Sequence, residues 1–310
     1  MVSFTAIVGV LLTGANALSL HPTVDNIPRS NAISKPSAGC GKDPLLTSGV
    51  QTMTVDNKIR QYTLRVPLGY DSNKPYKLIF AFHGYTSSMT EVATGLWKTN
   101  ISETITERWA YFGLQDKAEE SAIFIAPQGL VNDPLGAGWK NVGGEDIKFV
   151  DQMIATVGDG LCVDESKRFS TGYSYGGGMT YALSCARGDQ FAAVAAYSGA
   201  LLSGCENGTT PVPYLGIHGI SDPVLPIEQG KALRDDFVKK NGCQNTTAPE
   251  PAPGSLTHII TDYEGCKSGF PVRWIAFDGG HEQIPVDGGP NDSTKTWTPA
   301  EVWRFLNQFS

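Results

Sequence analysis

The stretch TGYSYGGG, from Thr171 to Gly178, places one serine among four glycines where an apolar run ends and a helical pattern begins. Its centre matches the pattern G-x-S-x-G. In that pattern the glycines let a strand turn sharply into a helix, and the turn exposes a nucleophilic serine. Ser174 is therefore the candidate nucleophile. The alternative is a glycine-rich turn in which the serine has a structural part only.

Apolar runs alternate with helical patterns on both sides of this stretch. Near-continuous runs that end in Gly or turn residues are typical of strands buried on both faces of a parallel sheet. Such runs cover 76–84, 121–129, 168–174, 191–199, 212–219 and 272–280, while 59–67 alternates like a half-exposed strand. Helical spacing covers 144–157, 177–187, 228–240 and 298–309. The alternation predicts an α/β fold, with a doubly wound, mostly parallel sheet and right-handed crossovers.

The domain organisation that we expect is simple. Neither a repeat nor a linker to a second module is visible, which predicts one catalytic domain over 39–310. Residues 18–38 are polar with scattered Pro and Ser, and predict a loose N-terminal arm. Residues 1–17 join a short apolar run to small residues ending in Ala17, which predicts a secretory signal peptide. A buried N-terminal strand is the alternative for that segment.

Cysteines and sequons agree with a secreted, extracellular protein. The 6 cysteines form an even set without metal-site spacing, so we expect disulfides and no metal. Cys243 and Cys266 bracket one short Pro-rich segment and are the predicted pair, whereas the pairing of the other four stays open. Asn-x-Ser/Thr sequons, where glycans attach to secreted proteins, begin at Asn100, Asn207, Asn245 and Asn291.

The charge balance limits the partners. There are 24 Lys and Arg against 31 Asp and Glu, a net charge of −7, and no basic run or stripe appears. Nucleic acid and anionic membrane surfaces are therefore not expected partners. We expect a monomer.

A serine hydroxyl becomes an effective nucleophile when a base takes its proton, and a third group must orient that base. His281 follows the last apolar run in a glycine-rich loop and is the candidate general base and acid, while His83 and His218 stand in His-Gly turns. Asp222 follows another strand end and is the candidate that orients His281. Its rival is Asp278. The order Ser, Asp, His is the one expected for the α/β-hydrolase fold.

The oxyanion that forms during serine attack needs backbone N–H donors. The amide of Tyr175, directly after the serine, is the first candidate. The second comes from the strand exit HGYTSS, residues 83–88, where Tyr85 is preferred and Thr86 is next. The alternative interpretation of HGYTSS is a tight turn at the end of a strand, without a part in catalysis.

Four segments together carry a family resemblance: LCVDESKRFSTGYSYGGGMTYALSCA (161–186), AAYSGA (195–200), HGISDPVLP (218–226) and GGHE (279–282). They resemble secreted fungal feruloyl esterases, of the carbohydrate esterase family that also holds acetylxylan esterases, with polyhydroxybutyrate depolymerase-like enzymes as relatives. The resemblance spans about residues 38–310. It implies a single α/β-hydrolase domain that cleaves ferulate and similar hydroxycinnamates from arabinose on plant cell-wall xylan, without a cofactor. It also implies Ser174, Asp222 and His281 as nucleophile, acid and base.

A phenolic acyl group calls for an apolar, partly aromatic slot, and Trp139, Tyr85 and Tyr175 are the candidate walls. Four alternative functions stay open at this point. Two are esterases with other substrates: an acetylxylan esterase and a polyester depolymerase of the hydroxybutyrate type. The others are a serine peptidase on the same scaffold and a secreted binding protein without catalysis.

Overall fold

The central strands are apolar on both faces, so the sheet must be covered on both sides. The computed structural model describes residues 34–96, 109–134, 136–205, 208–289 and 295–309. On β3 (Tyr76–Phe82), Leu78, Phe80 and Phe82 join one buried cluster, while Ile79 and Ala81 join another. A strand that buries both faces must lie inside a sheet covered on both sides.

In the described residues one sheet of nine strands has the order β1-β2-β4-β3-β7-β8-β9-β11-β10. Its strands are β1 (Gly49–Val55), β2 (Lys58–Arg65), β3, β4 (Ala122–Pro127), β7 (Val163–Tyr173), β8 (Ala193–Tyr197), β9 (Tyr214–Gly219), β10 (His258–Asp262) and β11 (Val272–Phe277). The strands from β4 to β11 in this order run parallel, and β1, β2 and β10 pair antiparallel at the two sides.

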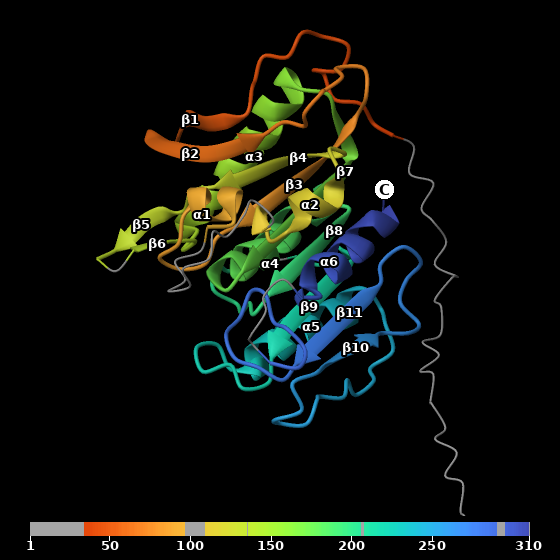
Figure 1. Cartoon of the computed structure of the whole chain (residues 1–310). Coiled ribbons are helices and arrows are strands. Elements are labelled where there is room, and N and C mark those ends of the chain that lie inside the picture. The colour runs from red at the N-terminus through yellow and green to blue at the C-terminus, as the bar shows by residue number, and fades with distance from the viewer. Residues whose placement is uncertain (1–33, 97–108, 135, 206–207, 290–294, 310) are drawn as a thin grey trace, which may run out of the picture.

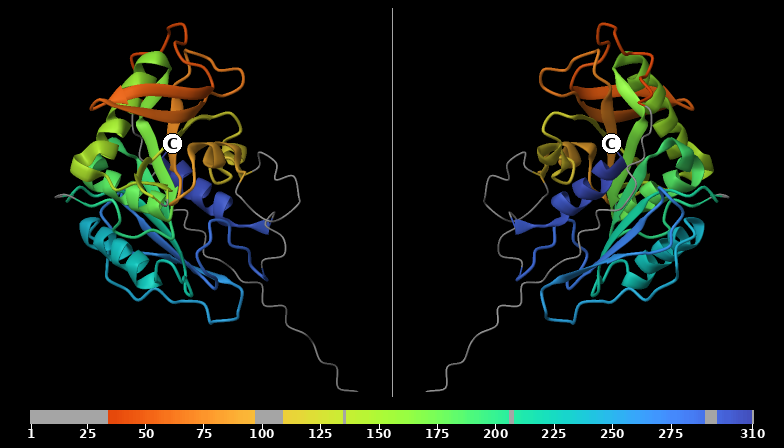
Figure 2. Two further views of the ribbon diagram at one scale, coloured as in Figure 1. Left: turned by 90° about the vertical axis from the view of Figure 1, so that its left-hand side faces the viewer. Right: turned by 90° about the vertical axis from the view of Figure 1, so that its right-hand side faces the viewer.

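Helices cover both faces (Figures 1 and 2). One cluster of buried residues packs α3 (Glu145–Gly160), α4 (Tyr175–Arg187) and α5 (Ile227–Lys240) on the sheet. The other packs α1 (Met89–Thr94), α2 (Leu114–Ala118) and α6 (Thr298–Leu306) on the opposite face. This arrangement is the α/β-hydrolase type. The predicted fold class is confirmed, because each predicted strand and helix is present. The sequence pattern missed β1, the hairpin of β5 (Leu130–Asp133) and β6 (Gly136–Gly138), and the short helices α1 and α2.

The boundary predicted for the N-terminal arm is wrong at its end. Ser37 is buried and its amide donates to the Val163 carbonyl at 2.8 Å, while Pro36 bridges Asp164. These contacts explain why β7 begins at Val163, five positions before the predicted 168, although its first half is polar. The rest of the arm and the signal peptide predicted for 1–17 lie outside the described residues.

The described residues hold three disulfides: Cys40–Cys162, Cys185–Cys205 and Cys243–Cys266. The predicted pair Cys243–Cys266 is confirmed. Of the sequon asparagines, Asn245 is exposed in the loop between α5 and β10, and Asn100, Asn207 and Asn291 lie outside the described residues. Within the described ranges, no helix has both the length and the apolar character needed to cross a bilayer.

Candidate active site

The turn between β7 and α4 carries the candidate nucleophile. Ser174 has φ 55° and ψ −114°, a combination that residues with a side chain rarely adopt, and its amide donates to the Tyr197 carbonyl of β8 at 2.9 Å. A Cβ at Gly172 would lie 2.3 Å from the Gly176 carbonyl oxygen, and one at Gly176 would lie 2.0 Å from the Phe82 carbonyl oxygen. Glycine is therefore required at both positions, and the sharp turn predicted from G-x-S-x-G is present.

Two of the three predicted catalytic side chains are in direct contact. His281 Nδ1 lies 2.6 Å from Asp222 Oδ2, and the Asp222 carboxylate is fully buried. The other carboxylate oxygen of Asp222 accepts the amides of Val224 and Leu225, both at 2.8 Å. A carboxylate at Nδ1 selects the tautomer in which Nδ1 carries the proton and Nε2 is the basic nitrogen.

The imidazole lies beside the nucleophile turn. The ring of Tyr173, the residue before Ser174, has its centroid 4.9 Å from that of His281. The Tyr173 hydroxyl donates to the His281 carbonyl oxygen at 2.9 Å. The loops after β9 and β11 also pack directly, since a Cβ at Gly219 would lie 2.3 Å from the Gly280 carbonyl oxygen. Segments far apart in the chain thus meet at the carboxyl end of the sheet, as expected for an α/β fold.

Asp278, the rival acid, has a different partner. Its carboxylate accepts the Leu256 amide at 2.8 Å, which holds the segment before β10 against the end of β11. Asp222 is therefore the carboxylate that contacts His281.

A second histidine lies behind Asp222. His218 is buried, and its Nε2 donates to the Leu225 carbonyl at 2.8 Å and lies 3.3 Å from Asp222 Oδ2. Burial lowers the pKa of His218, so the neutral ring is favoured. Gly230 on α5 leaves the room for this ring, because a Cβ there would lie 2.2 Å from His218 Nδ1. Only His218's place in a His-Gly turn was visible in the sequence.

The strand exit after β3 packs against the serine. A Cβ at Gly84 would lie 3.6 Å from the Ser174 Cβ. The amide of Thr86 donates to the Ala137 carbonyl at 2.9 Å, so Thr86, the second choice for the oxyanion site, is engaged elsewhere. The choice of Tyr85 as the donor from this loop stays a prediction. Tyr175 is the first residue of α4, where the helix dipole is positive.

Buried hydrogen bonds of His83 and Trp139 hold the loop after β3 in place. His83 Nε2 accepts the Gly129 amide at 2.9 Å, so its Nδ1 carries the proton and donates to the Gly84 carbonyl at 2.7 Å. Burial lowers the pKa of His83 to about 4. The Trp139 indole N–H donates to the His83 carbonyl at 2.9 Å, and the side chain is 0% exposed. The prediction that Trp139 lines the substrate pocket is therefore wrong: it supports the loop from the interior.

The side chains of Tyr85 and Tyr175 are partly exposed to solvent, in contrast to Trp139. Their ring centroids are 6.1 Å apart, and Tyr85 is 36% exposed. Both rings cover Gly138 of β6, where a Cβ would lie 2.6 Å from Tyr175 and 3.3 Å from Tyr85. The hairpin β5–β6, which the sequence pattern did not predict, therefore supports the two tyrosine rings that we expect to line the substrate site.

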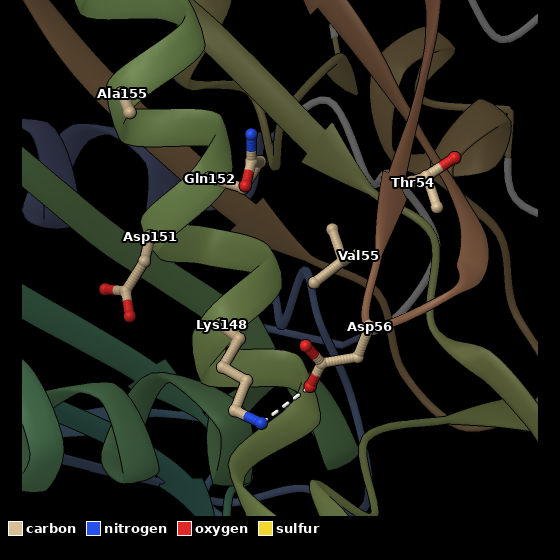
Figure 3. A pocket seen from close by; sticks show the side chains of 7 residues that line it. All are labelled: Thr54, Val55, Asp56, Lys148, Asp151, Gln152 and Ala155. Carbon is tan, nitrogen blue, oxygen red and sulfur yellow. Dashed lines mark hydrogen bonds and ion pairs between the residues drawn. The ribbon is translucent and has the colours of Figure 1, made fainter.

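A cavity of about 380 Å³ lies elsewhere, between β1 and α3 (Figure 3). Its lining is mostly polar and includes an ion pair in which Lys148 Nζ and Asp56 Oδ2 are 2.6 Å apart. It lies at β1, four places from β7 in the sheet order, and has no residue in common with the candidate site. In the part of the chain that the structure describes, no group of three or more His, Cys, Asp or Glu is placed to hold a metal ion.

Sequence comparison finds relatives that match most of the chain. A probable feruloyl esterase C of Aspergillus terreus is 48% identical over 262 residues, which cover 84% of this chain and 89% of the relative. Feruloyl esterase C of Emericella nidulans is 46% identical and covers 87% and 90%, respectively. Feruloyl esterase D of Neurospora crassa is 42% identical and covers 90% and 92%. No protein-family model matches the chain.

Solved structures share the fold at low sequence identity. A ferulic acid esterase from Anaeromyces mucronatus superposes with a TM-score of 0.56 at 14% identity, over 85% of this chain and 90% of the other. An acetyl xylan esterase from Aspergillus awamori gives the same TM-score of 0.56 at 16% identity, over 84% and 99%. At such identities these matches speak for the α/β-hydrolase fold alone.

Proposed function

The chain belongs to the family of fungal feruloyl esterases, and from that membership we propose that it releases ferulic acid and related hydroxycinnamates from plant cell-wall arabinoxylan. It is a carboxylic-ester hydrolase. The observation that carries the proposal is the His281–Asp222 contact of 2.6 Å beside a serine on a strained turn. This arrangement is what an acyl-enzyme mechanism requires.

In the first half of the proposed reaction Ser174 Oγ attacks the ester carbonyl carbon while His281 Nε2 takes the hydroxyl proton. The carbonyl oxygen becomes an oxyanion. When the tetrahedral intermediate collapses, the bond to the sugar oxygen breaks and His281 returns its proton to that oxygen. The sugar leaves as an alcohol, and the acyl group stays on Ser174 as an ester.

In the second half a water molecule repeats these steps on the acyl-enzyme. His281 accepts a proton from water, the hydroxyl oxygen attacks the acyl carbon, and the proton passes to Ser174 Oγ as the free acid leaves. Asp222 keeps its charge throughout and stabilises the imidazolium, and the amides of Val224 and Leu225 hold its other oxygen in place.

We assign the oxyanion site to the backbone amides of Tyr85 and Tyr175. The packing of Gly84 against Ser174 supports Tyr85, because it brings the loop after β3 to the serine. The start of α4 supports Tyr175, because the helix dipole adds positive potential there. Each such donor is worth about 3 kcal/mol of transition-state stabilisation.

The aromatic faces of Tyr85 and Tyr175 are the proposed contacts for the phenolic acyl group, since a flat ring stacks on or packs edge-to-face against such side chains. The substrate class is feruloylated plant polysaccharide or its oligosaccharides. Secretion is part of the proposal, and the three disulfides support it because they form in oxidising compartments.

Two measurements test the proposal. De-starched bran treated with the purified protein should release ferulic acid, and methyl ferulate should be cleaved with a higher kcat/KM than 4-nitrophenyl acetate or short hydroxybutyrate polymers. A preference for acetyl or hydroxybutyrate esters would replace the proposed substrate class, and cleavage of a peptide amide would indicate a peptidase.

The nucleophile is tested by covalent labelling with a fluorophosphonate, followed by mapping of the modified peptide. The label should reside on Ser174, and Ser174→Ala should abolish both labelling and ester turnover. Wild-type protein that resists the label would instead favour a secreted binding protein without catalysis.

A further inference from the structure

Tyr173 is the last residue of β7, directly before the candidate nucleophile, and its side chain contacts the loop that carries His281. Its hydroxyl donates to the His281 carbonyl oxygen at 2.9 Å, and the two rings are tilted by 42° with centroids 4.9 Å apart. Tyr173 also contacts the loop of the oxyanion site, because a Cβ at Gly84 would lie 3.1 Å from Tyr173 Cδ1. One side chain therefore touches two of the loops that meet at Ser174.

We propose that Tyr173 is a positioning residue that fixes the distance between nucleophile and base. This inference rests on the function proposed above. The backbone that turns at Ser174 also carries Tyr173, so a bond from Tyr173 to the His281 main chain ties the base to the nucleophile through one residue. The x residue of G-x-S-x-G would then have a specific part in the reaction.

The loop that carries His281 is tied to the loop after β9 at Gly279, whose carbonyl oxygen accepts the Ser221 amide at 3.0 Å, and to β7 at His281 itself through Tyr173. Gly279 and Gly280 precede His281, and glycines leave the main chain many conformations. Within the loop itself, the Gly280 amide donates to Glu282 Oε1, and Glu282 is exposed to solvent. The Tyr173 hydroxyl, by contrast, comes from the central strand β7, which is paired on both sides.

The Tyr173 hydroxyl keeps its proton at neutral pH. Burial raises the pKa of Tyr173, and the negative charges of Asp222 and Glu282 raise it further. The phenol consequently stays protonated and remains a donor. Because it donates to a main-chain carbonyl, its removal leaves the charges around the imidazole unchanged.

The test is Tyr173→Phe, which deletes the hydroxyl and keeps the ring. A small displacement of a catalytic group costs up to about 100-fold in rate, so kcat on methyl ferulate should fall about 10- to 100-fold while KM stays within about twofold. The rate of fluorophosphonate labelling should fall by a similar factor, because that reaction needs the same base. The acidic limb of the kcat/KM pH profile should not move.

Tyr181→Phe is the matched control. The Tyr181 hydroxyl donates to Asp236 at 2.7 Å, between α4 and α5, so the variant also loses one phenol hydrogen bond. It should lose a similar amount of stability in urea and keep wild-type kcat.

Three results would overturn the proposal: a Tyr173→Phe kcat within twofold of wild type, an equal fall of kcat in Tyr181→Phe, or a rise of KM at constant kcat. The last result would make the ring a wall of the substrate site. These outcomes are separate from failure of the proposed function, in which wild-type protein does not cleave hydroxycinnamate esters or Ser174→Ala stays active.

Discussion

At the scale of single residues, the conformation of Ser174 connects stability with function. A residue with a side chain at φ 55° and ψ −114° carries backbone strain of about 1–3 kcal/mol. The surrounding structure enforces it, because the Ser174 amide is bonded to β8 and the flanking glycines are packed against main chain. In the proposed mechanism this turn presents the Ser174 hydroxyl to the ester and places the first amide of α4 near the oxyanion.

Ser174→Gly should be more stable than Ser174→Ala by about 1 kcal/mol, because glycine adopts these backbone angles without strain. The larger conformational entropy that glycine loses on folding offsets only part of this gain. Both variants should be inactive. Urea unfolding measures the difference. At Ser184, inside α4, the same pair of substitutions should give the opposite order, because glycine disfavours a helix interior. A less stable Ser174→Gly would contradict the strain.

Asp222→Asn should lower kcat on methyl ferulate by about 10⁴-fold, because an amide at this position no longer stabilises the imidazolium and favours the wrong tautomer. Asp278→Asn should keep wild-type kcat, since that carboxylate accepts the Leu256 amide and does not touch the imidazole. A loss of this size in Asp278→Asn, with none in Asp222→Asn, would reassign the acid.

At the scale of elements, the nucleophile turn depends on how closely β3, β7 and α4 approach one another. A Cβ on Gly176 would lie 2.0 Å from the carbonyl oxygen of Phe82, the last residue of β3, and main-chain atoms cannot move aside as a flexible side chain does. The glycine at position 176 is thus explained by packing between elements as well as by the turn itself.

Gly176→Ala should therefore destabilise the protein by about 3 kcal/mol or more and abolish ester turnover. Gly158→Ala is the control: Gly158 lies in α3, and its Cβ would meet only a side-chain atom at 3.7 Å. It should be neutral or stabilising by up to about 1 kcal/mol. Urea unfolding of both variants checks the prediction, and a Gly176→Ala as stable as wild type would contradict it.

At the scale of the whole molecule, two buried neutral histidines make stability depend on pH. His83 holds the loop after β3 to the loop after β4, and His218 lies behind Asp222 after β9. Both pKa values are lowered by burial, that of His83 to about 4. Protonation of His83 removes the acceptor of the Gly129 amide, whereas His218 keeps its bond to the Leu225 carbonyl and its protonation is opposed by the burial of a charge.

The unfolded chain takes up a proton at His83 near its ordinary pKa of about 6.5, before the folded chain does so at about 4. The free energy of unfolding should therefore be insensitive to His83 above about pH 6.5, and fall by about 3 kcal/mol as the pH drops toward 4. His218 acts in the same direction. Urea unfolding at several pH values tests this, and His83→Gln should give a flatter profile. An unchanged slope would contradict it.

The α/β class, the turn at Ser174 and the candidate catalytic set of Ser174, Asp222 and His281 could be predicted from the amino-acid sequence. The reason is that these depend on local properties: runs of apolar residues, glycines at a sharp turn, and polar residues at strand ends. The pair Cys243–Cys266 belongs here too, because a short segment separates its two cysteines.

The contacts between groups far apart in the chain became visible in the folded structure alone. It paired the other cysteines, selected Asp222 over Asp278 as the partner of His281, and engaged the Thr86 amide elsewhere. It also moved Trp139 from the predicted pocket wall to the interior, and extended β7 through contacts with Pro36 and Ser37. These outcomes depend on the order of strands in the sheet and on packing between loops, which no local pattern encodes.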